Sequence, residues 1–262
     1  MNFFKNVYNH RQMLWNLIKS DFKNRYLGNH FGIIWAFIQP LVMVAIYWFV
    51  FTHGFKATPV DNVPFLAWLL AGMVPWFLMS EAITSSSRAI VDQSFLVKKI
   101  VFEVKLLPIV KIGSAFLVNT AFWGLLLLCI LLYKFYPTLM WLQIFYFLFC
   151  ALILILGAGL FLSAIMPFML DVGQFVSIFM QVMFWATPIF WNKDILSHKY
   201  SYIVKLNPFA YIVDGIRDVL LFNRPFWVHY WQTLYFWVLV LVLLFVGNKV
   251  FTKLRPHFSD VL

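Results

Sequence analysis

The chain has 262 residues, of which 63% are hydrophobic and only 11% are charged. A water-soluble fold of this length could not bury that much apolar surface, so the composition excludes a soluble globular protein. The formal net charge of +10 then indicates attraction to anionic lipid headgroups rather than to nucleic acid, which would require basic residues gathered on a soluble face.

Six apolar stretches are each long enough to cross the roughly 30 Å hydrocarbon layer, which takes about 20 helical residues. Their apolar runs are continuous rather than alternating, which predicts helices and not a barrel. We therefore expect an all-α membrane protein formed by a single transmembrane domain, residues 1–262. The six spans are expected at 31–53, 62–82, 108–133, 139–165, 172–191 and 230–249.

Residues 1–30 are expected to form an amphipathic helix at the membrane surface, ahead of the first span. On a helix, Leu14, Ile18 and Phe22 share an apolar face, while Lys19 and Lys23 share the opposite face. A helix of this kind lies in the plane of the headgroups. No apolar core with a small-residue cleavage site follows, so we do not expect a cleavable signal.

A few side chains within the spans carry information about gating or packing. Glu81 lies at the end of the second span and Lys111 near the start of the third. They could form a gate or an ion pair between adjacent helices, or they could simply reach the headgroups, as long side chains near a membrane surface commonly do. The small residues Gly159 and Ser163 permit close contact between helices.

Residues 85–105, between the second and third spans, are long for a connection within a membrane bundle. They combine a polar start that includes Arg88 with apolar residues such as Phe102, flanked by Lys98, Lys99 and Glu103. Apolar residues rimmed by charge indicate a short helix that docks onto another protein. A helix on the membrane surface, with lysines reaching the headgroups, explains the same pattern.

Residues 192–229, between the fifth and sixth spans, are expected to form re-entrant half-helices that dip into the outer leaflet and return. Prolines break this region, and the apolar pieces between them are too short to span. Asp214, Arg217 and Asp218 follow one another at i, i+3 and i+4, so one helical turn could hold a local ion pair. A pair of carboxylates could alternatively serve acid/base catalysis.

The distribution of positive charge predicts the orientation of the chain. Six spans place both termini and residues 85–105 on one side of the membrane. That side carries twelve Lys and Arg residues and the other side carries seven, which favours termini in the cytoplasm.

The sequence contains none of the common catalytic or metal-binding motifs. Its six histidines are scattered without the spacing of a zinc site. No phosphate-binding loop and no Ser-His-Asp, Cys-His or His-Glu-x-x-His arrangement is present. Cys129 and Cys150 fall inside spans and are expected to be inert buried thiols. We therefore expect no catalytic residue, no metal and no cofactor in this chain, and any energy input must come from a partner.

Three groups of residues carry a resemblance to a known family. The first is the pair Arg25-Tyr26 with FGIIWAFIQP at 31–40, and the second is KIVF at 99–102 with LLP at 106–108. The third combines TPI at 187–189, LNPF at 206–209 and GIRD at 215–218. Together, and in this order, they resemble the ABC-2 type permeases that export bacterial surface polysaccharides such as O-antigen, capsule and teichoic acid. Glu103 departs from the proline that the family often has there, and Asn29 and His30 depart from its usual residues.

The resemblance implies a permease subunit that moves lipid-linked polysaccharide across the bacterial inner membrane. Two copies would form a pore lined by the first, second and fifth spans. A separate ATP-binding-cassette ATPase would hold ATP and Mg²⁺ and bind residues 85–105. Its implied contact residues are Arg88, Lys98, Lys99, Phe102 and Glu103.

The resemblance also implies two sites for the substrate. Lys23, Arg25 and Tyr26 would form a cytoplasmic gate where an arginine can bind a lipid pyrophosphate, although ordinary positive-inside placement explains the charge equally well. The pore and outer gate would be formed by Trp35, Phe190, Trp191, Tyr211 and Arg217. The alternatives are an ABC-2 exporter of small drugs or lipids, and a membrane-embedded enzyme that acts on lipid-linked sugars through Asp214 and Asp218.

Overall fold

The computed structural model describes residues 10–25, 31–56, 58–97, 103–193 and 198–262. In these ranges the chain is helical, with one isolated β-bridge between Val60 and Val63 and no strand. The predicted all-α fold is thereby confirmed. The helices, in chain order, are α2 (Arg11–Asn24), α3 (Trp35–Phe49), α4 (Phe65–Ser87), α5 (Ala89–Asp92), α6 (Ser94–Val97), α7 (Leu106–Leu132), α8 (Gln143–Ile165), α9 (Val172–Ala186), α10 (His198–Leu206), α11 (Pro208–Leu221), α12 (Tyr230–Leu254) and α13 (Phe258–Val261).

Within the described residues, five helical segments are long and apolar enough to cross a membrane. They are Phe37–Gly54, Phe65–Ser87, Leu106–Leu132, Leu139–Ile165 and Phe226–Val261. The fifth expected span, 172–191, corresponds to the shorter apolar helix α9, which has 15 residues. It ends because Thr187 adopts an extended conformation, with φ −94° and ψ 135°, directly before Pro188, and the residue before a proline disfavours helix.

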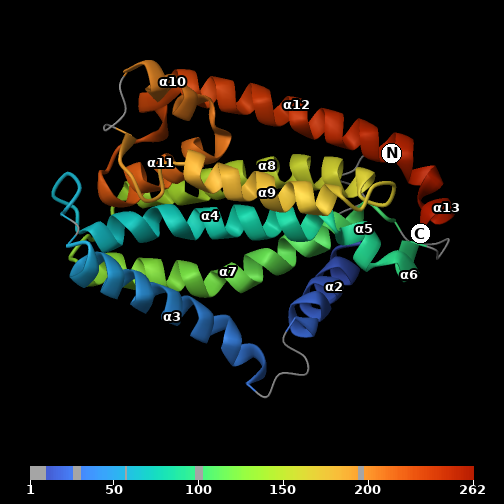
Figure 1. Cartoon of the computed structure of the whole chain (residues 1–262), viewed down its shortest axis with the longest axis horizontal. Coiled ribbons are helices and arrows are strands. Elements are labelled where there is room, and N and C mark those ends of the chain that lie inside the picture. The colour runs from blue at the N-terminus through green and yellow to red at the C-terminus, as the bar shows by residue number, and fades with distance from the viewer. Residues whose placement is uncertain (1–9, 26–30, 57, 98–102, 194–197) are drawn as a thin grey trace.

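The long helices run side by side along the longest axis of the molecule (Figure 1). Helices α2, α5, α6 and α13 lie at one end of this bundle, and α10 and α11 lie at the other end (Figure 1). Helix α4 lies in the middle, packed against α7, α8, α9 and α11. Most of its side chains are therefore buried, whereas almost none of α3 is buried within the described chain.

Glycines bring α8 and α12 into close contact. A Cβ added at Gly247 on α12 would lie 2.6 Å from the carbonyl oxygen of Gly157 on α8. Similarly, a Cβ added at Gly159 would lie 2.6 Å from the Ser86 hydroxyl of α4. Only glycine allows these separations, so the small-residue face expected around Gly159 does serve helix packing.

The predicted outer segment contains two short helices, α10 and α11, which meet at Asn207. The Asn207 side chain caps α11 by accepting a 2.9 Å hydrogen bond from the backbone N–H of Phe209, and Pro208 occupies the first helical turn, where no backbone donor is needed. Helix α11 packs against α4 and α8. Two non-spanning helices are thus present where half-helices are expected, and their re-entrant path through a membrane stays a prediction.

Candidate functional site

Helix α2 packs along the beginning of α7. Leu14 is buried against Leu106 and Val110, and Ile18 fills the space above Gly113, where an added Cβ would lie 2.6 Å from the Ile18 Cδ1 atom. The apolar face predicted for this amphipathic helix therefore contacts protein along part of its length. This contact places the last turn of α2 beside α7, and the Arg25 side chain reaches α4 from there.

Arg25, the arginine predicted at the cytoplasmic gate, is paired with two acids. Its guanidinium forms an ion pair with Glu81 of α4, and its Nε atom lies 3.5 Å from a carboxylate oxygen of Asp21 one turn earlier on α2. The other carboxylate oxygen of Glu81 accepts a 2.9 Å hydrogen bond from the Asn119 side chain of α7. Arg25 thus connects α2 to α4 directly, and to α7 through Glu81.

Lys111 of α7 connects α2 to residues 85–105, which we call the coupling loop from here on because the sequence predicts that they dock onto a partner. Its Nζ atom lies 2.8 Å from Asp21 Oδ1 of α2 and 3.3 Å from Asp92 Oδ2 of α5. Asp92 also lies 3.8 Å from Arg88, whose side chain is more than half exposed. The sequence allows an ion pair between Glu81 and Lys111 as one alternative. In the structure, Glu81 pairs with Arg25 and Lys111 pairs with Asp21, so each contacts α2. We call the residues Asp21, Arg25, Glu81, Asp92, Lys111 and Asn119 the α2 network.

The exit of the coupling loop contacts the C-terminal part of the chain. Arg255 donates a 2.8 Å hydrogen bond to Glu103, the residue that departs from the family pattern. Lys105 donates to the side chains of Asn248 and Thr252. Burial lowers the pKa of Lys105, Glu103 opposes this shift and Arg255 adds to it. Among the other predicted ATPase contacts, Lys98, Lys99 and Phe102 lie outside the described residues.

Arg217 is the central residue at the other end of the bundle. It is buried, and its guanidinium lies over the Trp68 ring, with Cζ 3.6 Å from the ring centroid. Its three nitrogens donate to the backbone carbonyls of Trp68, Pro188 and Ile189. Gly72 makes room for it, because a Cβ at this position would lie 2.3 Å from the Arg217 Nη2 atom. The arginine therefore fastens α11 to α4 and to the turn that ends α9.

A second polar contact joins the same turn to α11. The Asn207 side chain, which caps α11, also donates a 3.0 Å hydrogen bond to the Thr187 hydroxyl. Together with the Arg217 contacts, this bond brings the TPI, LNPF and GIRD motifs into one structural unit. Their separation along the sequence hides this relationship.

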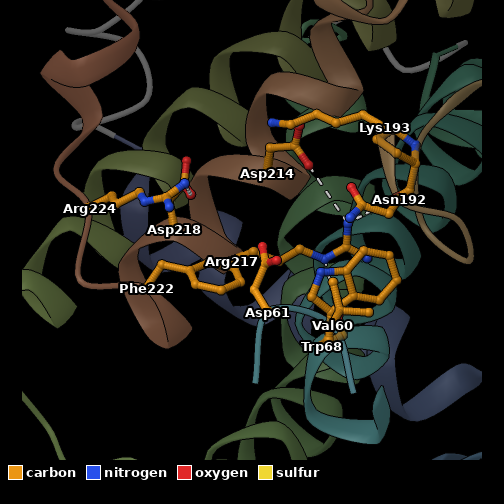
Figure 2. Close-up of a pocket in the computed structure, with 11 residues that line it drawn as sticks. Val60, Asp61, Trp68, Asn192, Lys193, Asp214, Arg217, Asp218, Phe222 and Arg224 are labelled. Atoms are coloured by element: carbon orange, nitrogen blue, oxygen red, sulfur yellow. Dashed lines mark hydrogen bonds and ion pairs between the residues drawn. The ribbon is translucent and has the colours of Figure 1, made fainter. Parts of the chain in front are cut away.

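A small cavity of about 110 Å³ borders Arg217 (Figure 2). Asp214 contributes a carboxylate to it, 3.1 Å from Lys193 and 3.7 Å from Arg217. Asp218 lies 3.9 Å from Arg224, and both are seen together at the left of Figure 2. Each carboxylate of the i, i+4 pair thus has a cationic partner. Among the described residues, no group of three or more His, Cys, Asp or Glu side chains could hold a metal ion.

The aromatic residues predicted for the pore and outer gate do not form a single cluster in the structure. Phe190 stacks on Phe51 at the far end of the first span, and Trp191 donates its indole N–H to the carbonyl of Trp185. Tyr211 is buried between α8 and α12. Trp35 lies exposed at the beginning of α3, the opposite end of the first span from Phe51. The structure therefore groups Phe190 and Trp191 but leaves Trp35 apart from them.

Tyr211 belongs to a buried network rather than to an open surface. Its hydroxyl lies 3.0 Å from the hydroxyls of Tyr146 and Thr233, and Tyr146 accepts a 3.0 Å hydrogen bond from Trp237. These bonds join α11 to α8 and α12. Tyr211 therefore holds α11 against α8 and α12, and its part in an outer gate stays a prediction.

Sequence reasoning missed several members of these sites. Asp21 gave a usable signal, because it is the only acidic residue among the first 60 and stands four residues before Arg25. No such signal marks Gly72, Trp68 or Asn119 in the sequence, because these residue types are common within apolar helices. Their roles follow only from which helices lie next to each other.

A bundle of apolar spans, with short helices packed at both of its ends, defines a multi-pass membrane protein. A family model described as "ABC-2 type transporter" matches residues 12–221, which is most of the chain. The chain therefore belongs to the ABC-2 type transporter family, and the resemblance seen in the sequence is confirmed.

Curated relatives cover nearly the whole chain. Two proteins from Klebsiella pneumoniae, both named O-antigen export system permease protein RfbA, are each 28% identical over 256 residues, which is 94% of this chain and 93% of each relative. A protein of the same name from Myxococcus xanthus is 24% identical over 263 residues, with 98% of this chain and 97% of the relative covered.

Proposed function

We propose that this chain is the permease subunit of an ATP-driven exporter that moves a lipid-linked polysaccharide, such as O-antigen, outward across the bacterial inner membrane. The observation that carries this proposal is the similarity over almost the full length to proteins named O-antigen export permeases. The match leaves no large part of either chain unpaired. Both termini are proposed to face the cytoplasm, in agreement with the positive-inside distribution.

A separate ATP-binding-cassette ATPase is proposed to supply the energy. The sequence has no phosphate-binding loop of its own. The coupling loop offers a docking surface for such a partner, because Phe95 on α6 is 71% exposed next to the charged end of the bundle. Asp92, at the end of α5, pairs with Lys111, which in turn pairs with Asp21 of α2. Movement of the loop would therefore reach α2 through these ion pairs.

A second copy of the chain is proposed to complete the pore. Helices α3 and α9 present large apolar side chains that the described part of a single chain leaves exposed, including Phe37, Phe49, Phe175 and Trp185. Helix α4 is mostly buried within one copy. We therefore assign the pore-facing role to the first and fifth spans and no longer to the second.

The α2 network is proposed to respond to the substrate headgroup. A lipid pyrophosphate would compete with Glu81 for Arg25, because an arginine binds phosphate and carboxylate in the same bidentate manner. Lys23 is exposed in the last turn of α2, where it would add positive charge. Tyr26, the third residue predicted here, lies outside the described residues.

The enzyme alternative finds less support in the outer aspartates. Asp214 lies 3.1 Å from Lys193, and Asp218 lies 3.9 Å from Arg224. Each acid therefore already has a cationic partner in the fold, as expected of structural ion pairs. Export of small drugs or lipids would use the same fold, so the nature of the cargo needs an experiment.

The decisive experiment is purification of the full chain from its native membranes in mild detergent, with identification of what remains bound. We expect a stoichiometric chain that contains a phosphate-binding loop, and at least half of it should be lost when Lys98 and Lys99 are both changed to Glu. The matched control reverses Lys56 and Lys134, which the charge distribution places on the other side of the membrane. Purification of the chain alone, together with turnover of a lipid-linked sugar in vitro, would contradict the proposal.

A further inference from the structure

The C-terminal end of the chain packs against both described ends of the coupling loop. Phe251 and Phe258 are completely buried in one apolar cluster with Ile90, at the beginning of the loop, with Val104, at its exit, and with Leu107 in the first turn of α7. Figure 1 shows α13 at the same end of the bundle as α5 and α6. Residues 248–262, which we call the C-terminal segment, therefore pack against the described ends of the coupling loop.

Polar contacts fix the exit of the loop more specifically than the apolar cluster does. Arg255 lies 2.8 Å from Glu103, while Lys105 lies 3.0 Å from the Asn248 side chain and 2.9 Å from the Thr252 hydroxyl. Asn248, Thr252 and Arg255 follow one another at i, i+4 and i+7, which places them on one face of a helix. One face at the end of the last span thus contacts two residues of the loop exit.

The last span is itself held closely against α8. The separation at Gly247 and Gly157 brings the backbones of α12 and α8 together one residue before Asn248. Two helices in such close contact cannot slide past each other without a clash, since packed interiors tolerate little overlap. The beginning of the C-terminal segment is therefore held in position relative to α8, and residues of the loop exit that contact it are held with it.

We propose that the C-terminal segment positions the exit of the coupling loop for energy coupling, with Arg255 and Asn248 as positioning residues that act through Glu103 and Lys105. The 2.8 Å ion pair holds the Glu103 side chain against the C-terminal segment. A force applied to the loop by a partner is then passed to α7 and to the α8–α12 pair. Without this contact the force would bend the loop exit instead. The role in coupling rests on the function proposed above, whereas the positioning itself does not.

The first test measures positioning without any partner, by hydrogen exchange in the full chain reconstituted into lipid nanodiscs. Arg255→Glu should speed exchange of the amides at 103–107 by about threefold, because a partly exposed ion pair contributes modestly. Phe258→Ala should speed it by more than tenfold, because it opens a buried apolar cluster. The charge exchange Glu103→Arg with Arg255→Glu should restore slow exchange. Lys253→Glu, exposed two residues earlier on α12, is the matched control and should change nothing.

The second test measures coupling, using the complex with the ATPase that copurifies with the chain. Arg255→Glu should lower the amount of glycan exported per ATP hydrolysed by at least threefold, at unchanged yield of the complex. The conservative variant Arg255→Lys and the double charge exchange should both export as much glycan per ATP hydrolysed as the unchanged chain. A merely structural contact would lower yield and leave the ratio unchanged.

The outcomes separate this inference from the proposed function. Unchanged exchange at 103–107 in Arg255→Glu and in Phe258→Ala, or an equal change in Lys253→Glu, would overturn the inference. Altered exchange with an unchanged ratio of export to hydrolysis would overturn the coupling role. Absence of any copurifying ATPase would contradict the proposed function and leave the exchange result standing.

Discussion

At the residue scale, Arg217 shows how a single buried charge can organise one end of a membrane protein. Its guanidinium satisfies three backbone carbonyls and stacks on Trp68, and Asp214 lies within 3.7 Å. A buried charge is tolerated only where it is paired and hydrogen-bonded to this extent. The space for it depends on Gly72, which faces the guanidinium directly.

Replacement of Gly72 by Ala should therefore destabilise the protein by about 1–3 kcal/mol, the usual cost of overpacking a well-packed interior. The new Cβ would meet Arg217 Nη2 at 2.3 Å and Cζ at 2.8 Å, and the arginine cannot move away because three carbonyls hold it. The measurement is the free energy of unfolding in mixed detergent micelles. Gly124→Ala on α7 is the control, since among the described residues the added Cβ would meet no atom within 4 Å beyond its own stretch of helix, and it should be neutral or stabilising by up to ~1 kcal/mol. Equal effects of the two substitutions would contradict the role of Gly72.

At the scale of the elements, α2 is joined to the bundle by charge as well as by apolar packing. Asp21 is 8% exposed and stands between Lys111 and Arg25. Among the described residues, its Oδ2 atom accepts no hydrogen bond and lies 3.5 Å from Arg25 Nε, whereas Lys111 donates a 2.8 Å hydrogen bond to Oδ1. Such an arrangement is costly to break, because a lone charge would be left in a low-dielectric environment.

Lys111→Met should accordingly destabilise the protein by about 3 kcal/mol, at the lower end of the range for breaking a buried pair, since Arg25 still compensates part of the charge on Asp21. The double variant Asp21→Asn with Lys111→Met should recover more than half of this loss. Unfolding free energies of the single and double variants give the coupling directly. Lys23→Met, in the exposed last turn of α2, should have no effect beyond about 0.5 kcal/mol. Additive effects of the two single substitutions would show that the pair does not interact.

At the scale of the whole molecule, composition and hydropathy were sufficient to predict an all-helical membrane bundle, because lipid forces continuous apolar runs into helices. The same reasoning failed to predict the length of α9. The stretch 172–191 contains no charge, yet its helix stops at Ala186 because Pro188 follows. The ion-pair partners of charged side chains could not be predicted either. Glu81 and Lys111 are recognisable in the sequence as charges within spans, but their pairing with α2 depends on how that helix packs against α7.

Helix α9 is shorter than the apolar helical segments that the structure describes as long enough to span. Its 15 residues span about 22 Å as a helix, less than the roughly 30 Å of the hydrocarbon layer. The residues that flank it, 166–171 and 187–191, continue the path at both ends, and α9 runs beside α4 in the bundle (Figure 1). We therefore predict that the chain does cross here, with non-helical flanks that are covered by protein where they enter the membrane.

Labelling of introduced cysteines in intact cells tests this crossing, after Cys129 and Cys150 have been replaced by Ala. A membrane-impermeant thiol reagent should leave Leu170→Cys unlabelled until the cells are opened, and it should label Trp227→Cys from outside, because a crossing by α9 separates these two exposed positions. Val261→Cys near the C-terminus should behave like Leu170→Cys. If Leu170→Cys and Trp227→Cys were labelled from the same side, α9 would not cross, the chain would have five spans, and its two ends would lie on opposite sides of the membrane. Positive charge would then no longer account for the orientation, since the basic residues of α2 and of the last turn of α12 would face different compartments.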